Sequence, residues 1–232
     1  MRSTEAALAG AGAAILGWIV GLPLGLAIPA ALVAGANGLI SGLRGIYAWR
    51  TPSGWIGFVL DSTWGLVGTA ASTLIHALQA AMPSGRYRAD LSLRRGRHVY
   101  EGGYRIRSGF ASAIGNVITN ADGVSGLDGT GGPRRRLLVD RHEMLHVWQQ
   151  RWFGPLFPIL YAAWAVVAGL LGLMIGLSTR RSVFKSVFTL AYYDNPFEYW
   201  AYRRDRYWPP AGADPVLAWR GGVKESPTDD IV

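Results

Sequence analysis

From Ala6 to Ile40 the chain runs for 35 residues without a charged side chain. A helix needs about 20 apolar residues to cross a bilayer, so this run is long enough to anchor the chain in a membrane. Pro23 and Pro29 interrupt it, and we therefore expect a kinked or broken helix. A cleaved signal peptide is the weaker alternative, because the preceding residues are only weakly basic and no small-residue cleavage site follows.

Three glycines of this run, Gly17, Gly21 and Gly25, lie four residues apart and would share one helix face. Small residues on a membrane helix let a second helix approach closely. We expect this face to pack within the chain, with an oligomeric pore as the alternative.

A second apolar segment, Gly54–Ala81, carries more polar residues, among them Asp61 and His76. It predicts a second, less hydrophobic membrane helix. An acid inside a membrane helix is often functional, although an interfacial position suits Asp61 equally well. For His76 a snorkelling or capping role is favoured over metal binding. Residues 1–82 are therefore predicted to form a transmembrane helical hairpin.

The following residues are polar and predict a mixture of strands and a helix. Arg86–Arg107 alternates in part and predicts short strands, and Gly109–Asn120 predicts another. A loop rich in glycine and aspartate is expected over 122–132. Pro133 then suits the first turn of a helix that should end at Gly154.

A third uncharged segment, Phe157–Leu177, follows this helix, and the last residues are rich in proline, glycine and aspartate. We predict a mainly α membrane protein. After the N-terminal hairpin comes a small α+β domain over 83–208. It includes residues 157–177 as a further hydrophobic helix or re-entrant hairpin, and a flexible tail spans 209–232.

Composition narrows the class of protein. Only 16% of residues are charged, there is no cysteine, and the net charge is +8. These values exclude a disordered chain, a disulfide scaffold, a thiolate zinc site and a cysteine nucleophile. The arginine clusters are short and lack a recognition motif, so nucleic acid is not an expected partner; an anionic membrane face and the positive-inside rule explain the basic balance better.

The strongest motif is His142-Glu143-Met144-Leu145-His146. Two imidazoles at i and i+4 lie on one face of a helix, so both can reach a single Zn²⁺. The adjacent Glu143 can accept a proton from an attacking water molecule. The alternative is a helix with two structural histidines and no metal.

A zinc site normally needs a third protein ligand. Glu198 is the best candidate, because the Asn-Pro-Phe-Glu segment that it ends would place it in the first turn of a helix. Asp194 and His98 are the other candidates. Glu198 could instead be a helix-start acid or an ion-pair partner of Arg203 or Arg204.

The motif with Gln149 resembles the H-E-x-x-H-x-x-Q helix of zincin-type peptidases, and the Asn-Pro-Phe-Glu segment resembles the second glutamate helix of the gluzincin group. Many bacterial membrane proteins of unknown function share this pairing. The resemblance implies a zincin-like domain with Zn²⁺ as the cofactor. It also implies His142, His146 and Glu198 as metal ligands and Glu143 as the general base.

Gluzincins usually add a histidine or tyrosine that stabilises the oxyanion. No motif here selects one. The segment Phe110–Asn120 would match the edge strand that binds the substrate backbone in zincins. The candidates for the oxyanion role are Tyr193, Tyr199, Tyr202 and His98.

Between Pro83 and Pro155 the chain has 12 Arg and 6 acidic residues, a net charge of +6, which predicts a cytoplasmic location. If residues 157–177 crossed the membrane once, Glu198 and His142 would lie on opposite sides and could not share a metal. We therefore favour a bent, re-entrant or in-plane hairpin, with Gly169, Gly172 and Gly176 allowing a break.

Two functions are compatible with these patterns. The first is a membrane-anchored zinc peptidase of the bacterial inner membrane, with a peptide or protein substrate. The second is a non-enzymatic, metal-stabilised scaffold or assembly subunit, whose partner would be another copy of the chain or a different membrane protein.

Overall fold

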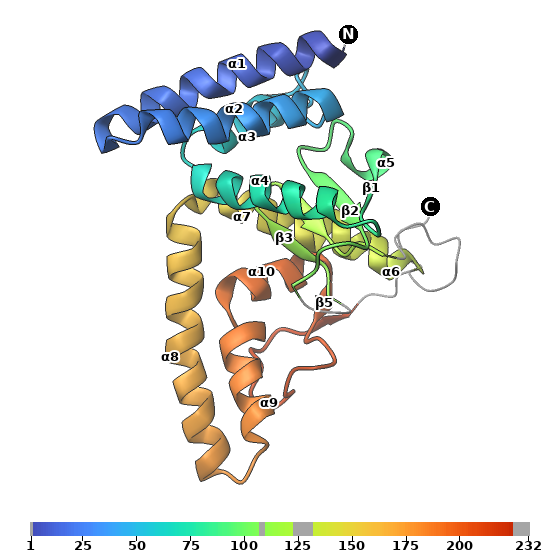
Figure 1. Ribbon diagram of the computed structural model, residues 1–232. Coiled ribbons are helices and arrows are strands. Elements are labelled where there is room, and N and C mark those ends of the chain that lie inside the picture. The colour runs from blue at the N-terminus through green and yellow to red at the C-terminus, as the bar shows by residue number, and fades with distance from the viewer. Residues whose placement is uncertain (1, 107–109, 123–131, 225–232) are drawn as a thin grey trace.

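The computed structural model describes residues 2–106, 110–122 and 132–224, except for the side chains of 132–134 and 223–224. It is mostly helical with a small mixed sheet. Figure 1 shows two helical hairpins that project from a central part built of the sheet and α3, α4 and α7. Most of the loop expected over 122–132 lies outside the described residues.

The first hairpin consists of α1 (Arg2–Gly21), the short 3₁₀ turn η1 (Leu22–Leu24) and α2 (Ala27–Arg44). The uncharged run is thus two antiparallel helices (Figure 1), so the break that we expected is a full reversal of the chain. Gly25 makes the reversal with φ of +69°, a conformation that favours glycine. Pro29 lies in the first turn of α2, where its missing N–H costs nothing.

The two helices of this hairpin touch through small residues. A Cβ added to Gly17 would lie 2.5 Å from the carbonyl oxygen of Ala30, and one added to Gly21 would lie 2.7 Å from that of Leu26. The glycine face therefore packs within the chain, as expected. Gly25 is not part of it, because it forms the turn.

The segment expected as one second helix is two: α3 (Pro52–Ser62) and α4 (Leu66–Ala81) meet at an angle of 87°. Thr69 Oγ1 donates a hydrogen bond to the Asp61 carbonyl oxygen across the break, at 2.6 Å. The side chain of Asp61 is buried and forms a bidentate ion pair with Arg151, with N–O distances of 2.8 Å. Asp61 is therefore a partner of the motif helix rather than an isolated membrane acid.

The sheet has the strand order β1-β2-β4-β3. Strand β1 (Arg86–Tyr87) pairs antiparallel with β2 (His98–Glu101), and the short helix α5 (Ala89–Ser92) connects them. Strand β2 runs parallel to β4 (Val117–Thr119), and β3 (Ser112–Ile114) forms an antiparallel hairpin with β4. One edge of β3 therefore has no strand partner among the residues that the structure describes.

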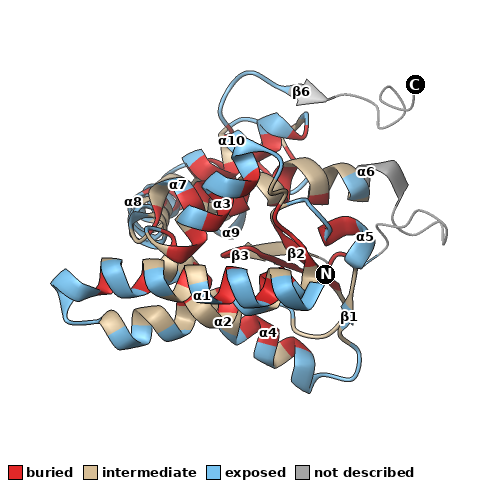
Figure 2. Cartoon of the chain, turned by 90° about the horizontal axis from the view of Figure 1, so that it is seen from above, coloured by how far each residue is buried: buried red, intermediate tan, exposed pale blue. Residues whose placement is uncertain are grey.

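The motif lies on a rod of three continuous segments: α6 (Gly132–Leu137), a π-helical turn η2 (Leu138–Glu143) and α7 (Met144–Phe153). The rod ends at Gly154, as the sequence predicted. It packs on the sheet, and Figure 2 shows buried residues concentrated there. The core shared by rod and sheet is Leu91, Val99, Ile118, Ala121, Val139 and Val147.

The second hairpin begins with α8 (Leu156–Ser178), which is one unbroken helix. The chain returns along α8 through α9 (Val183–Phe188) and the π-helical turn η3 (Thr189–Tyr193), which together form the return arm of this hairpin (Figure 1). Helix α10 (Pro196–Arg204) follows. The expectation of a break inside 157–177 is therefore wrong, although a hairpin is present.

The glycines of α8 serve the packing of this hairpin. A Cβ at Gly172 would lie 2.7 Å from Val187 Cα, and one at Gly176 would lie 2.7 Å from Val183 Cα. These glycines therefore do not break α8. Their small size lets the return arm pack closely against the helix. The return arm brings Asn195 back to the first turns of α8, where its Nδ2 donates to the Tyr161 carbonyl oxygen at 3.3 Å.

The segment after α10 includes a small ribbon of β5 (Tyr207–Trp208) and β6 (Val223–Lys224). Residues between these strands, which we expected to be flexible, lie against α10 and the second hairpin, and Ala213 and Ala218 are buried.

Within the described ranges, three helices are long and apolar enough to cross a membrane: α1 together with η1, α2 and α8. The bent pair of α3 and α4 makes a fourth candidate if it is counted as one span.

Candidate metal centre

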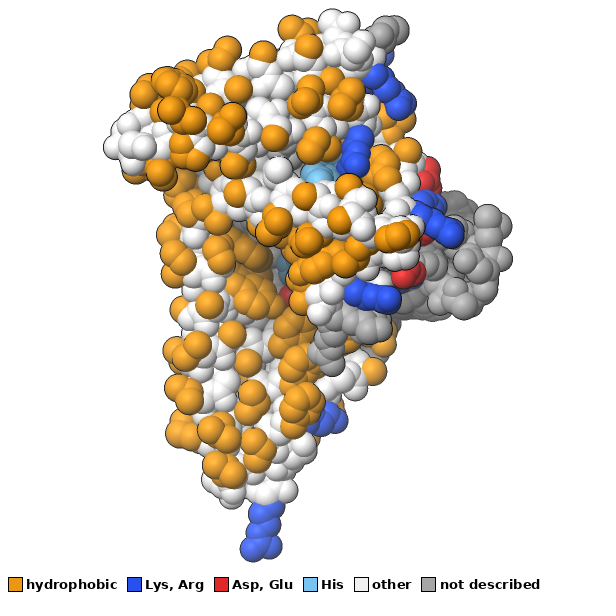
Figure 3. Space-filling view, in the orientation of Figure 1, with side chains coloured by type: hydrophobic (Ala, Val, Ile, Leu, Met, Phe, Trp, Pro, Cys, Tyr) orange, Lys and Arg blue, Asp and Glu red, His pale blue; other side chains and the backbone are white. Residues whose placement is uncertain are grey.

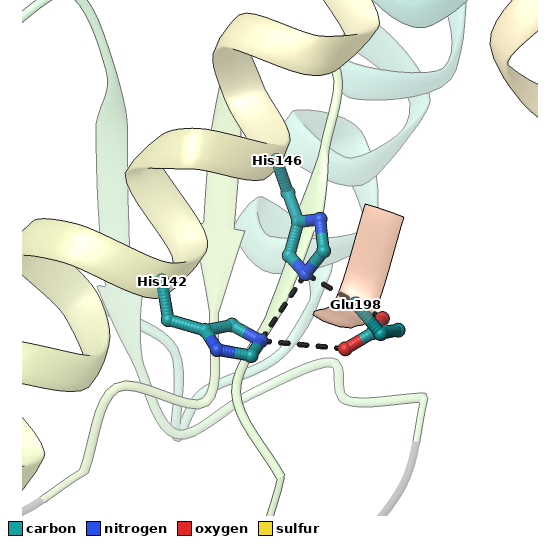
Figure 4. A group of neighbouring side chains, drawn as sticks. All are labelled: His142, His146 and Glu198. Carbon is teal, nitrogen blue, oxygen red and sulfur yellow. Dashed lines mark hydrogen bonds and ion pairs between the residues drawn. The ribbon is translucent and has the colours of Figure 1, made fainter. Parts of the chain in front are cut away.

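Three side chains from two separate helices meet at one point (Figure 4). His142 lies at the end of the π-helical turn η2, and His146 follows four residues later in α7. Glu198 lies in the first turn of α10. Asn195 is the N-cap of this helix, and its Oδ1 accepts a hydrogen bond from the backbone N–H of Phe197 at 3.1 Å.

The distances bring the three side chains within reach of one ion. The Nε2 atoms of His142 and His146 are 3.2 Å apart. Glu198 Oε2 lies 3.4 Å from Nε2 of His142, and its Oε1 lies 3.5 Å from Nε2 of His146. All three residues are buried. The structure thus brings together the two motif histidines and the candidate glutamate.

Neighbouring polar groups hold these side chains in place. Gln149 Nε2 donates to the Phe197 carbonyl oxygen at 3.0 Å, which turns its Oε1 toward His146 Nδ1 at 2.7 Å. His146 must therefore carry its proton on Nδ1, and the lone pair of Nε2 faces Glu198. Tyr161 donates its hydroxyl hydrogen to Glu198 Oε1 at 2.9 Å.

His142 has an outer partner of the same kind. Its Nδ1 lies 3.4 Å from Oδ2 of the buried Asp205. A carboxylate behind a metal-binding imidazole fixes the orientation of the ring and raises its basicity.

The donor set fits a metal cation. Two imidazole nitrogens 3.2 Å apart can face each other only when a hydrogen atom or a metal ion lies between them, because two lone pairs would repel each other. Glu198 Oε2 is buried and has no hydrogen-bond partner among the described residues. Buried polar groups are otherwise almost always satisfied, so this oxygen is suited to coordination. The group of His142, His146 and Glu198 could therefore bind a metal.

The electrostatic environment favours positive charge at the histidines. Burial alone would lower the pKa of His142, but the carboxylates of Asp205 and Glu198 outweigh it and raise the pKa to about 10. Burial also opposes charge on His146, yet the nearby Glu198 carboxylate raises its pKa. The pKa of Glu198 itself is lowered, because the two imidazoles outweigh its burial.

Glu143 has the opposite environment. It is buried beside the other carboxylate of the site, and burial raises its pKa above the usual range despite the two neighbouring imidazoles. Two glutamates of one site therefore differ in their affinity for a proton.

A cavity of about 540 Å³ gives access to this group. Glu143 and the three candidate ligands form part of its wall, and residues 111–113 at the outer strand β3 form another part. Figure 3 shows a hollow beside α8, bordered mainly by hydrophobic side chains. The aromatic residues at the wall are Phe110, Phe157, Tyr161, Phe188 and Tyr192.

The other ligand candidates lie elsewhere. His98 is in β2, with its Nε2 3.1 Å from Ser41 Oγ and its ring 4.4 Å from that of His76. Asp194 accepts a hydrogen bond from the backbone N–H of Trp219 at 3.1 Å. The structure therefore brings neither of these two side chains to the group around His142, and it brings Glu198 there.

The candidates for the oxyanion role do not line the cavity. Tyr193 belongs to the aromatic cluster behind α10, and the hydroxyl of Tyr199 donates to the Arg220 carbonyl oxygen at 3.2 Å. Tyr202 packs its ring edge-on against His142 at 4.5 Å, and His98 lies in the sheet. The tyrosines at the cavity wall are Tyr161 and Tyr192 instead.

Sequence reasoning missed Asp205 and Tyr161. Asp205 follows Glu198 by seven residues, which is two helical turns, so the periodicity of α10 could have found it. No sequence signal links Tyr161 to Glu198, because their contact depends on the return of the second hairpin.

Comparison with protein-family models, with curated proteins and with solved structures gives no match.

Asp205→Asn should weaken metal binding about 10- to 100-fold, the usual effect of losing a partner behind a ligand. Asp194→Asn is the matched control, because Asp194 is equally buried but has no contact with the donor group. The measurement is a competition titration with a chelating dye. Equal affinities for the two variants would contradict the role given to Asp205.

Proposed function

We propose that the protein is a membrane-anchored zinc peptidase with a zincin-like domain. The observation that carries this proposal is the combination of the buried two-histidine, one-glutamate group with Glu143 at the wall of the same cavity. The long apolar helices support the membrane anchor, and the net charge of residues 83–155 supports a cytoplasmic orientation.

Zinc is the metal that suits two imidazoles and one carboxylate best, and it would act as a Lewis acid toward water and the peptide carbonyl. Glu143 accepts the proton of the attacking water and delivers it to the leaving amine nitrogen. Tyr161 and Gln149 keep Glu198 and His146 in place during the reaction.

The outer edge of β3 supports an extended peptide as the substrate. An edge strand presents unpaired backbone groups that a peptide can match as an additional strand. Gln150 already occupies one end of this edge, where its Nε2 donates to the Ala113 carbonyl oxygen at 3.1 Å. The peptide would therefore lie along the part of the wall near Ala111, next to Glu143.

A metal-stabilised scaffold is the second candidate. It is favoured by the burial of all three side chains, because a metal ion held between them would join η2 and α7 to α10, as a structural zinc ion does.

The direct test uses the purified protein in lipid nanodiscs with a library of quenched fluorescent peptides. The proposal expects cleavage that stops on chelation and returns when zinc is added back. Cleavage that survives complete removal of the metal would contradict it, and so would absence of cleavage in protein shown to contain zinc.

A further inference from the structure

The side of α8 that faces away from α9 is a continuous apolar surface. It extends along the full length of the helix, while the opposite side is covered by the return arm. Residues 152–179 include no charged side chain. The exposed large apolar residues of α8 are Leu156, Ile159, Leu160, Val166, Val167, Leu170, Leu171, Leu173, Met174 and Leu177.

The covered side of α8 is not suited to lipid. The irregular segment 209–222 runs beside it, with the Trp219 ring 5.5 Å from that of Trp164 and Asp214 within 3.3 Å of Arg181. Irregular backbone exposed to lipid does not occur in the hydrocarbon core. Since this segment accompanies α8 from Trp164 to the residues just after its end, lipid cannot surround α8 on all sides, and only its uncovered face is free to contact acyl chains.

The first hairpin runs across the direction of α8. Figures 1 and 2, seen at right angles to each other, both show the tip of the α1–α2 hairpin on the side of the molecule to which the uncovered face of α8 is turned. Figure 3 shows hydrophobic side chains over this same side. Because the two hairpins run in different directions, they cannot both cross the same flat bilayer. The surface of one bilayer leaflet can, however, contact the tip of the first hairpin and the uncovered face of α8 together.

The tip of the first hairpin is apolar and exposed. Leu22, Leu24, Leu26 and Ile28 are each more than half exposed, and no charged residue occurs between Ala6 and Leu43. If the hairpin crossed the whole membrane, these apolar side chains would be exposed to water on the far side, which is unfavourable. The tip is therefore suited to the interior of the bilayer.

Two exposed tryptophans lie where the apolar surface of α8 begins. Trp64, at the bend between α3 and α4, donates its Nε1 hydrogen to the Trp152 carbonyl oxygen at 3.0 Å. Trp152 precedes α8 by a few residues, and tryptophan is enriched at the level of the lipid headgroups.

We infer that the protein enters its membrane from one side only. The α1–α2 hairpin inserts tip first, and α8 lies flat on the same leaflet with its uncovered face among the acyl chains. The occupant of both surfaces is the lipid of that leaflet. This placement rests on the membrane anchor of the proposed function and is independent of its zinc chemistry. It also explains how His142 and Glu198 share one side of the membrane.

The test is a depth profile along α8. The chain has no cysteine, so single cysteines at Ile159, Val167 and Leu177 can each carry a fluorescent probe in the full-length protein. The vesicles consist of phosphatidylcholine and phosphatidylglycerol, with a nitroxide quencher placed near the headgroup or near the acyl-chain end. A helix that lies flat gives the same quenching at all three sites, strongest with the shallow quencher. A crossing helix gives its deepest signal at Val167, which would overturn the inference.

Two further positions complete the design. Val216, in the segment after α10, is the matched control, because its side chain is 68% exposed and that of Val167 is 70% exposed. A probe at Val216 should not be quenched by either nitroxide. Leu24 at the hairpin tip should be quenched most by the deep nitroxide. If Leu24 instead reacts with an impermeant maleimide from the opposite side of the membrane, or if Val167 is protected by a second copy of the chain and unquenched, the placement is wrong. Quenching and labelling do not depend on catalysis, so these measurements test the membrane placement even if the protein proves not to be a peptidase.

Discussion

His146→Ala should leave the purified protein without bound metal, whereas the wild type should retain about one zinc ion per chain. The Nε2 of His146 faces both His142 and Glu198, so its removal leaves only two donors and an open side. Two protein ligands do not hold zinc tightly. Elemental analysis after extensive dialysis measures the difference.

Two other variants make the result specific. His76→Gln removes a histidine outside the group, and it should retain the metal. Glu198→Gln should reduce retention, because a neutral amide is a poorer ligand than a carboxylate. Metal content that is equal in wild type and His146→Ala, or zero in both after purification with zinc present, would contradict the metal centre. Circular dichroism of each variant shows whether the chain is still folded.

Glu143→Gln should lower peptidase activity by about 10²–10⁴-fold, the usual contribution of a positioned base. The amide keeps the shape of the side chain but cannot accept the proton of the attacking water. Glu143 lies at the cavity wall without belonging to the ligand group, so metal content should stay unchanged. Peptide cleavage and zinc content are measured on the same preparation.

The same variant separates the peptidase from the scaffold. If the protein serves only as a scaffold, Glu143→Gln has no effect, while His146→Ala removes function together with the metal. A deletion strain rescued by each variant gives the comparison in cells. Full rescue by Glu143→Gln would mean that the cell does not need hydrolysis from this protein.

The group of His142, His146 and Glu198 could be predicted in part because its signals are local. The spacing of His142 and His146 places both on one helix face whatever the rest of the chain does. The Asn-Pro start of α10 likewise sets Glu198 in a first turn. These signals do not show which distant segments meet, and for this reason the sequence favours Glu198 as the third ligand but leaves Asp194 and His98 as alternatives.

The two hairpins could not be predicted in detail because their turns depend on tertiary packing. A run of uncharged residues with Pro23 and Pro29 is compatible with a kink or with a reversal, and Gly25 decides between them only through its backbone conformation. In α8 the sequence allows Gly172 and Gly176 to be positions where the helix breaks. They are contact points, and only the position of Val183 and Val187 on the return arm shows it.

The order of the ligands along the chain has a consequence for the biogenesis of the protein. His142 and His146 precede α8, and Glu198 follows the return arm. During synthesis on the ribosome the two histidines emerge first, and the third ligand arrives only after the whole second hairpin has been made and has folded back. A nascent or truncated chain that ends before α10 contains the complete H-E-x-x-H motif but not the complete site. If this group binds a metal ion, the ion can be held by all three side chains only when the chain has folded through α10.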